Sequence, residues 1–275
     1  GFQTYIPQRI QGFSGESKRR SVIELSDFPD YTIPLLQNKI PRAKISNCPH
    51  CTSMLSYQPN QCAEECEIFL KAMKKNPMQF VQTFMTAPSP GIIATTMHNA
   101  FYDSYENYIF SLADQMRKEY ELIHSHNLLL QIDAPDILME RHLEFQDLSL
   151  SEYRKKIELH VEAINRAIVN IPREDVRLHT CWGNYQGPHI YDVELKDVID
   201  IIYQAKVGAI SIALANPRHQ HEYKIFKSHP LPDSMILIPG VVDTTTSYVE
   251  HPEVIADRIC LAIKAVGDPS RVIAG

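Results

Sequence analysis

The chain lacks the features that mark membrane, exported and disulfide-stapled proteins. No window of its 275 residues approaches the ~20 consecutive apolar residues that a membrane-spanning helix needs. Its N-terminal segment lacks a basic stretch followed by an apolar one, which is the pattern of a secretory signal. Six cysteines are too few to staple a chain of this length through disulfides. We therefore expect a soluble protein of the reducing cytoplasm, with no membrane partner.

Charge of either sign is not concentrated in blocks. The formal net charge is -6 and the sequence pI is about 6.1, with acidic and basic residues interspersed. The basic run Lys18-Arg19-Arg20 is short and typical of a solvated loop. Because duplex-binding domains usually carry a clustered basic face and a pI above about 9, we expect no nucleic-acid partner.

The hydrophobic content is 44%, enough for one sizeable core, and α/β barrels commonly have about this length. No internal repeat or low-complexity tract divides the chain. Residues 1–42 are rich in Pro, Gly, Ser and charge, and we interpret them as a loop-rich lid or connecting segment. We expect a single α/β-barrel domain over residues 1–275.

Short apolar runs alternate with helical stretches after residue 42, which is the pattern of a parallel sheet covered by helices. The runs expected to form strands are 44–47, 79–85, 128–132, 176–181, 209–212, 235–238 and 272–274. The stretches expected to form helices are 62–75, 107–126, 151–170, 195–205 and 252–266. Ser149 and Ser151 are candidate N-caps, and Pro252 suits a first helical turn.

The densest group of reactive residues lies at 179–189, at the end of a strongly apolar strand. His179 and Cys181 are two residues apart, so both side chains lie on one face of that strand. An imidazole and a soft thiolate make half of a tetrahedral zinc site, which needs further ligands from other strands. The alternative is a buried cysteine beside a hydrogen-bonded core histidine.

Polar clusters also follow the neighbouring strands. Asp133 ends one apolar run, Asn216-Pro217-Arg218-His219 follows another, and Asp243 follows a third. Because the carboxyl ends of parallel strands meet at one edge, clusters after successive strands predict a shared pocket.

Five segments occur in the order found in one superfamily: Ser89-Pro90-Gly91, Gln131-Ile132-Asp133, His179-Thr180-Cys181-Trp182-Gly183-Asn184, Ala215-Asn216-Pro217-Arg218-His219 and Gly240-Val241-Val242-Asp243. Over residues 80–275 the chain resembles the cobalamin-independent methionine synthase superfamily, especially the branch of epoxyalkane:coenzyme M transferases and methionine synthase II-like proteins. The resemblance implies a (β/α)8 TIM barrel of the methionine synthase type. It also implies a zinc ion that binds a substrate thiol and presents the thiolate to an electrophilic carbon.

Motif by motif, the resemblance assigns His179 and Cys181 as the first two zinc ligands. The family's third ligand, a carboxylate, falls on Ala213, which cannot coordinate a metal. The fourth is a cysteine of an Asp-Cys-Gly segment expected directly after Gly275. The zinc site is therefore incomplete as written. Thr245 stands where methionine synthases carry a catalytic histidine, which argues against methionine synthesis proper.

Within the shared pocket, the candidate catalytic residues are Asp133, His189, His219 and Asp243. The candidate substrate-binding residues are Trp182, Asn184, Asn216, Arg218, His221 and Glu250. The function that the resemblance implies is a zinc-dependent thiol alkyltransferase or lyase that attacks a methyl or epoxide carbon. The alternative is a metal-free, diverged barrel enzyme or small-molecule-binding protein that uses the same pocket. A third hypothesis is a non-catalytic subunit that pairs with another chain.

The family's opening motifs, a strand ending in Val-Gly-Ser and another ending in Asp-Gly-Glu, do not precede the matching region. We therefore expect residues 1–275 to belong to a longer protein, or to a diverged relative, with a barrel incomplete at both ends. Because a barrel without all its strands leaves an unpaired edge, we expect an open edge or a covering partner chain. A homo-oligomer is compatible with this expectation.

Two cysteine pairs, Cys48 with Cys51 and Cys62 with Cys66, have spacings compatible with a structural zinc site. The alternative is the ordinary burial of small thiols. The ten residues between the pairs are few for a usual zinc ribbon, which favours burial.

Overall fold

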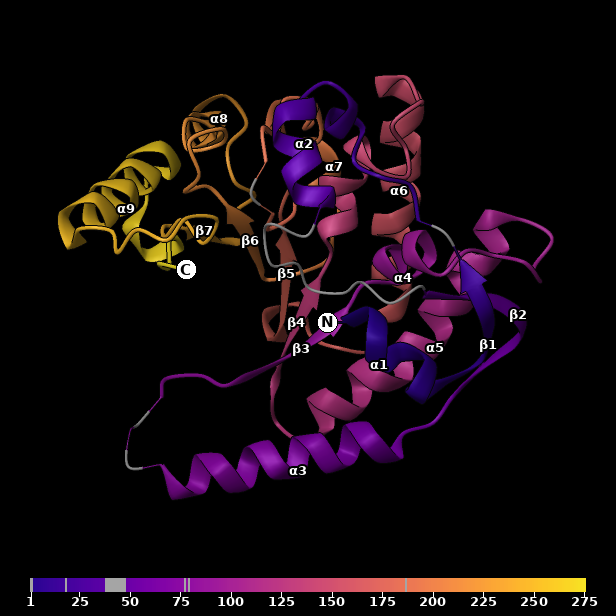
Figure 1. The fold of residues 1–275 in the computed structure, drawn as a ribbon. Helices are drawn as coiled ribbons and strands as arrows, with labels where there is room; N and C mark the ends of the chain where they lie inside the picture. Colours follow the sequence, from indigo (N-terminus) through magenta and orange to yellow (C-terminus); the bar gives the residue numbers. More distant parts are fainter. Residues whose placement is uncertain (1, 18, 38–47, 77, 79, 186) are drawn as a thin grey trace.

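The chain forms a parallel sheet with helices packed on it and a separate antiparallel strand pair (Figure 1). The computed structural model describes residues 2–17, 19–37, 48–76, 78, 80–185 and 187–275. The parallel sheet has the strand order β3-β4-β5-β6-β7. The strands are β1 (Ile10–Ser17), β2 (Cys48–Tyr57), β3 (Phe84–Pro88), β4 (Leu129–Asp133), β5 (Val176–Thr180), β6 (Ala209–Ala213) and β7 (Ile236–Gly240). The predicted α/β class with a parallel sheet is confirmed.

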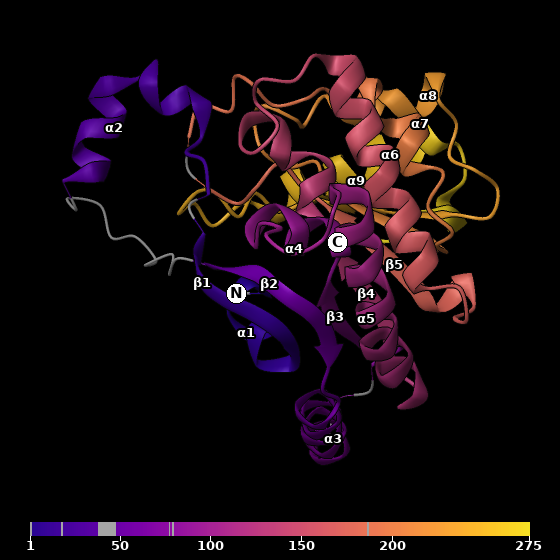
Figure 2. The same ribbon diagram turned by 90° about the vertical axis from the view of Figure 1, so that its right-hand side faces the viewer.

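Helices follow each strand of the parallel sheet along the chain. These are α4 (Pro90–Thr96), α5 (Tyr105–Ser125), α6 (Leu150–Ala167), α7 (Ile199–Ile202), α8 (Ile225–Ser228) and α9 (Pro252–Val266). Before the parallel sheet come α1 (Phe2–Arg9), α2 (Pro29–Leu36) and α3 (Asn60–Lys75). Figure 2 shows α5 and α6 side by side. Ser149 caps α6 in a capping box with Glu152, and Pro252 begins α9, as the sequence predicts. Among the described residues, no helix combines the length and the apolar character needed to cross a membrane.

Side-chain alternation divides the parallel strands into two faces. The residues Leu130, Ile132, Leu178, Ile210 and Ile212 are fully buried in the same core as the apolar face of α5, which consists of Tyr108, Leu112, Met116, Tyr120 and Ile123. Each such side chain contributes roughly 1.5–3 kcal/mol through burial. The alternate residues, such as Gln131, Asp133, Arg177 and His179, are only partly buried on the opposite face. That second face therefore carries the polar side chains.

The predicted strands agree with the structure in most places. The run 79–85 is wrong in its start, because pairing with β4 begins at Phe84, while Val81 is fully exposed. Residues 272–275 run beside β7 through a Leu237–Val272 bridge and a hydrogen bond from the Ile273 amide to the Leu237 carbonyl. The run 44–47 lies outside the described residues. The described residues thus contain five parallel strands of the expected eight, and within them β3 pairs with β4 alone.

Two other expectations are wrong. The single helix expected over 195–205 is a 3-10 turn (Leu195–Asp197) followed by α7, because Val198 leaves the helical region at φ -139°. The described part of the segment expected as loop, residues 1–42, contains α1, β1, a 3-10 turn (Ile23–Ser26) and α2. Ile6 and Ile10 are fully buried there, and this apolar burial offsets the cost of ordering the segment.

A buried ion pair fastens the N-terminal elements to α5. Arg9 Nη1 lies 3.0 Å from Glu119 Oε1, and the Tyr5 hydroxyl donates to the same oxygen at 2.9 Å. Further along, Glu24 accepts hydrogen bonds from the Tyr185 hydroxyl and from the Ile190 amide. Residues near 24 therefore lie against the loop that follows β5.

A buried polar chain supports the carboxyl ends of β3 and β4. Ser89 caps α4 and also donates to Asp136 Oδ1 at 2.5 Å. The other oxygen of Asp136 lies 2.7 Å from His160 Nδ1, and the Tyr105 hydroxyl lies 2.7 Å from His160 Nε2. A Cβ at Gly91 would lie 2.0 Å from Asp136 Oδ2 and 2.5 Å from His160 Nδ1.

We predict that Gly91→Ala lowers the free energy of unfolding by about 1–3 kcal/mol or more, because the added methyl displaces a fully buried hydrogen-bonded pair. Urea denaturation measures the change. Gly267→Ala is the control, because Gly267 has positive φ but open space around its Cβ position, so its cost is that of the backbone alone, roughly 1–2 kcal/mol. A Gly91→Ala protein as stable as the unsubstituted chain contradicts the packing described here.

Candidate active site

The parallel register brings the predicted site residues to one edge of the sheet. Asp133 is the last residue of β4, and its Cα partner on β5 is His179. Cys181 directly follows β5, Asn216 follows β6 by three residues, and Asp243 follows β7 by three residues. As predicted, these residues lie at or just after the carboxyl ends of the strands, while their shared pocket and their chemical roles stay predictions.

Asp133 and His179 face each other across the two strands. Asp133 Oδ1 lies 3.5 Å from His179 Nε2, and the two side chains are 17% and 28% exposed. Burial, with a further effect of the Asp136 carboxylate, raises the pKa of Asp133 to about 7. Burial lowers the pKa of His179. The pair therefore has a carboxyl group that gains and loses its proton near neutral pH, beside a neutral imidazole.

Cys181 lies close enough to the same carboxylates for them to oppose its ionisation. Burial raises the pKa of its thiol to about 12, and the charges of Asp133, Asp136 and Asp192 act in the same direction. The thiol is protonated at neutral pH in this environment. A sulfur in this state is a weak nucleophile and a poor metal ligand.

The ligand set that the resemblance implies for zinc is not complete at this place. Continuing the register of β5 and β6, in which Thr180 pairs with Ile212, places Ala213 beside Cys181. Its methyl group occupies the position where the family has a carboxylate. Within the described residues, the side chains placed to hold a metal ion jointly are His189, Asp192 and His219, a group that contains neither His179 nor Cys181. His179 and Cys181 alone do not fit a zinc site of three or four protein ligands.

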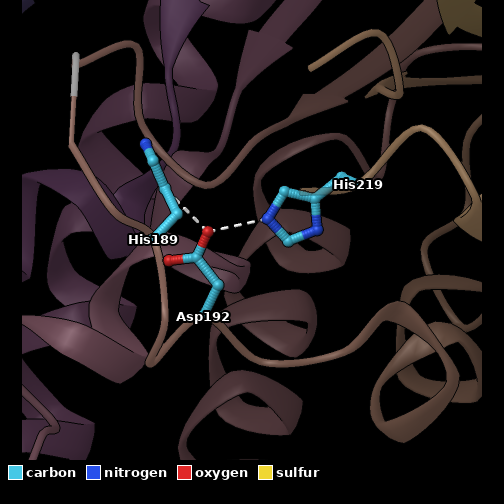
Figure 3. Close-up of side chains that lie close together, drawn as sticks. All are labelled: His189, Asp192 and His219. Carbon is cyan, nitrogen blue, oxygen red and sulfur yellow. Dashed lines mark hydrogen bonds and ion pairs between the residues drawn. The ribbon is translucent and has the colours of Figure 1, made fainter. Parts of the chain in front are cut away.

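A second group of titratable side chains surrounds Asp192 in the loops after β4, β5 and β6, and Figure 3 shows three of its members, His189, Asp192 and His219. We call it the Asp192 cluster, and it consists of His142, His189, Asp192, His219 and Glu222. Asp192 Oδ2 lies 2.7 Å from His189 Nδ1 and 2.7 Å from His219 Nε2. Its other oxygen lies 2.7 Å from His142 Nδ1. Glu222 contacts His219 Nδ1 at 2.9 Å and accepts the Leu195 amide proton.

Burial and pairing act in opposite directions on the Asp192 cluster. Burial alone would raise the pKa of Asp192, but the three histidines hold it well below its usual range. Burial likewise opposes charge on His189 and His219, but the carboxylates raise the pKa of both imidazoles. These two predicted catalytic histidines are thus buried and fully engaged in the described structure, which makes them poor contacts for a substrate.

Trp182, a predicted substrate-binding residue, is also buried. Its ring stacks on that of His219 with centroids 3.6 Å apart, and its indole N–H donates to the Val193 carbonyl. The side chain is 1% exposed. In this structure Trp182 packs against the Asp192 cluster rather than facing solvent.

The other predicted residues lie further along the same edge. Asp243 binds the amide and hydroxyl of Thr245, and Glu250 pairs with Arg258 at 2.6 Å while accepting the Asp243 amide proton. The Thr244 hydroxyl donates to Asn184, which is exposed.

Asn216, Arg218 and His221 belong to the loop after β6. The Asn216 side chain accepts the His219 amide proton, which shapes the turn that presents His219. Arg218 is exposed, and His221 lines a cavity of about 200 Å³ between the loop after β6, the end of β7 and α9. Their predicted substrate-binding role remains a prediction.

The sequence interpretation missed His142, Asp192, Glu222 and Arg258. Two of them follow histidines at the same spacing, since Asp192 comes three residues after His189 and Glu222 three residues after His219. That repeated spacing could have predicted the two contacts, because in a turn a residue and the residue three positions later place their side chains on the same side of the chain. Nothing comparable in the sequence pointed to His142.

The paired cysteines do not form a metal group among the described residues. Cys51, Cys62 and Cys66 are buried free thiols, and burial raises the pKa of Cys62 to about 12. Cys51 donates to the Ser53 carbonyl within β2. These described thiols are therefore buried, which is the alternative to structural zinc that the sequence left open.

Comparisons with known proteins agree with the motifs. No family model matches the chain. It is 29% identical over 184 residues to a methionine synthase of Thermococcus kodakarensis, covering 66% of this chain and 46% of that protein. It is 26% identical over 176 residues to a methionine synthase of Sulfurisphaera tokodaii, covering 64% and 44% respectively. It is 23% identical over 124 residues to the 2-hydroxypropyl-CoM lyase of Xanthobacter autotrophicus, covering 36% and 33%.

The fold matches a solved barrel protein along nearly the whole chain. A B12-independent methionine synthase from Shewanella sp. W3-18-1, solved in complex with selenomethionine, superposes with a TM-score of 0.68 at 16% identity, covering 99% of this chain and 70% of that one. The chain spans less than half the length of the three relatives above. The chain is thus similar to proteins of the cobalamin-independent methionine synthase-like superfamily, and its distant relatives include methionine synthases and a 2-hydroxypropyl-CoM lyase.

Proposed function

We propose that the chain is a transferase or lyase that acts on a small thiol, or on the thioether made from it. In this proposal Asp133 moves the reaction's proton and His179 orients the Asp133 carboxyl group. The observation that carries this proposal is the contact between the two side chains, which lie 3.5 Å apart at the carboxyl ends of adjacent parallel strands. Sites in folds of this kind lie at that end of the sheet.

The sulfur chemistry comes from the relatives. Methionine synthase and 2-hydroxypropyl-CoM lyase are named for reactions on sulfur compounds, since methionine is a thioether. The chain covers only part of each of these proteins. The substrate class is therefore transferred to this chain as a proposal.

The proton step follows from the residues. A thiol attacks carbon as the thiolate, so its proton must first be removed. The family resemblance implies that zinc removes this proton, but Ala213 leaves the set of zinc ligands incomplete. The Asp133 carboxylate takes the S–H proton instead, the sulfur bonds to a methyl or epoxide carbon, and the proton passes to the leaving nitrogen or opened epoxide oxygen. A lyase runs the same steps in reverse: the carboxylate takes the proton of the hydroxyl group, the oxygen closes the epoxide as the C–S bond breaks, and the protonated carboxyl gives its proton to the departing thiolate.

The environment of Asp133 suits this task. A carboxyl group with its ordinary pKa near ~3.9 is too weak a base to hold a proton at neutral pH. Burial and the Asp136 charge bring the pKa of Asp133 to about 7, where both protonation states are populated. His179 remains neutral and presents Nε2 to the carboxyl, so it orients the group without fixing its charge.

We predict that kcat/KM depends on a single ionisation near pH 7 and that Asp133→Asn removes this dependence and lowers the rate between about 100- and 10,000-fold. The reason is that the amide cannot exchange a proton in this range. Release of free thiol from 2-hydroxypropyl-CoM, followed across pH 5–9, is the measurement.

Asp257→Asn on α9 is the matched control, because Asp257 is exposed and distant in sequence from Asp133 and His179. Its pH profile should equal that of the unsubstituted protein. If Asp133→Asn keeps the ionisation near pH 7 at full rate, Asp133 is not the group that moves the proton.

A second candidate function, the zinc-activated thiolate, is favoured by the presence of His179 near the end of β5 and of Cys181 directly after that strand. We predict that Ala213→Glu raises the affinity for zinc at this place by orders of magnitude, because the new carboxylate would lie beside Cys181. Loading with Co²⁺ reports on the site, since a bound thiolate adds a charge-transfer band in the near ultraviolet.

The band is expected in Ala213→Glu and absent from the unsubstituted protein. Ala213→Gln is the control of equal size without the charge, and Cys181→Ser in the Ala213→Glu background should abolish the band. A strong thiolate band in the unsubstituted protein would establish zinc activation as the better account of the function.

A further inference from the structure

The Asp192 cluster joins three loops that are far apart in the sequence. His142 ends a 3-10 turn after β4, His189 and Asp192 lie in the loop after β5, and His219 lies in the loop after β6. All four side chains are less than a tenth exposed, and Figure 3 shows the Asp192 carboxylate between His189 and His219. Such burial makes the bonding of every nitrogen and oxygen in the cluster energetically important.

Both ring nitrogens of His219 and of His189 face oxygen acceptors. In His219, Nδ1 contacts Glu222 Oε2 and Nε2 contacts Asp192 Oδ2. In His189, Nε2 contacts the Tyr185 carbonyl oxygen and Nδ1 contacts the same Asp192 oxygen. A neutral imidazole has one N–H and one lone pair, so one nitrogen of each ring can face an acceptor favourably only if a proton or a metal cation lies there.

The outer contacts resemble the way proteins hold metal-binding histidines. Such a histidine donates its second N–H to a carboxylate or a backbone carbonyl, which fixes the ring and frees the other nitrogen for the metal. Glu222 provides the carboxylate for His219, and Tyr185 provides the carbonyl for His189. The two freed nitrogens then both point to Asp192.

His142 gives a second, independent indication. It is 1% exposed, and neither of its ring nitrogens has a hydrogen bond among the described residues. Its Nδ1 lies 2.7 Å from Asp192 Oδ1 without hydrogen-bond geometry, and that oxygen is itself without a hydrogen bond. A buried, unbonded imidazole aimed at a carboxylate is costly unless another group completes its bonding.

We propose that His189, Asp192 and His219 bind one divalent cation of the zinc class, and that the ring of His142, which lies beside Asp192 Oδ1, moves in to supply the fourth ligand. The site is a buried structural one, separate from His179 and Cys181. Three imidazoles and one carboxylate are a suitable tetrahedral donor set for Zn²⁺, and four protein ligands leave no open position for a substrate. One divalent cation also balances the charges of Asp192 and Glu222, so no net charge is left in the buried cluster. The proposal does not depend on the thiol chemistry proposed above.

The ion would fasten the loops that frame the pair of Asp133 and His179. His189 has a left-handed backbone with φ 57°, which a residue with a side chain adopts at a cost, and a bond to its ring would offset that cost. Trp182 stacks on His219, so the cluster also fixes the segment that follows Cys181.

The test is metal analysis of the full chain after saturation with Zn²⁺ and dialysis. We expect about one zinc per chain, loss of that zinc to a strong chelator, and a lower Tm in the metal-free protein. The Co²⁺ form should show tetrahedral ligand-field bands without the charge-transfer band of a thiolate. The double variant His179→Ala/Cys181→Ala should keep the full zinc content.

Asp192→Asn should lose the zinc, and His229→Gln, an exposed histidine, is the matched control that should keep it. Glu222→Gln leaves every ligand in place and should weaken zinc binding roughly 10- to 100-fold, so it tests the site even if Asp192→Asn does not fold. Absence of stoichiometric zinc from the saturated protein, or unchanged affinity in Glu222→Gln, would overturn the proposal. A thiolate charge-transfer band in the Co²⁺ form of the protein would also overturn it. So would loss of zinc from the double variant His179→Ala/Cys181→Ala.

Discussion

The register of the parallel strands is the constraint on which the candidate site depends. Because side chains alternate along a strand, the pairing of Asp133 with His179 also directs Leu130, Ile132 and Leu178 into the core. A shift of one residue in β5 would turn His179 toward the helices and Leu178 toward the polar face. The apolar core of the sheet thus holds the proton-transfer pair in place, although none of its residues takes part in the chemistry.

Two aspartates near the carboxyl ends of the strands, Asp133 and Asp192, show how this scaffold sets opposite electrostatics. Asp192 is surrounded by three imidazoles, which keep it ionised despite burial. Asp133 has one imidazole at 3.5 Å and the charge of Asp136 nearby, so burial prevails and its pKa rises to about 7. The number of neighbouring groups and the sign of their charges, rather than the residue type, determine which carboxylate stays ionised and links the loops and which one can exchange a proton.

Much of the fold could be predicted because it depends on local patterns. The apolar face of α5, the Ser149 cap and the apolar strands β4 to β6 all follow from periodicity and residue type. The N-terminal elements could not be predicted, because Ile6 and Ile10 gain their stability from contacts far along the chain. Asp133 and His179 were found through strand-end motifs, whereas His142 and Asp192 depend on loop geometry that a single sequence does not reveal.

Asp133 should exchange its proton near neutral pH, and a carboxyl carbon NMR titration of aspartate-labelled protein tests this most directly. Comparison with the Asp133→Asn spectrum assigns the signal. We expect a midpoint near the value of about 7 that burial and Asp136 impose. A midpoint near the ordinary aspartate value of ~3.9 would show that Asp133 is ionised throughout the neutral range and would contradict the proposed proton transfer.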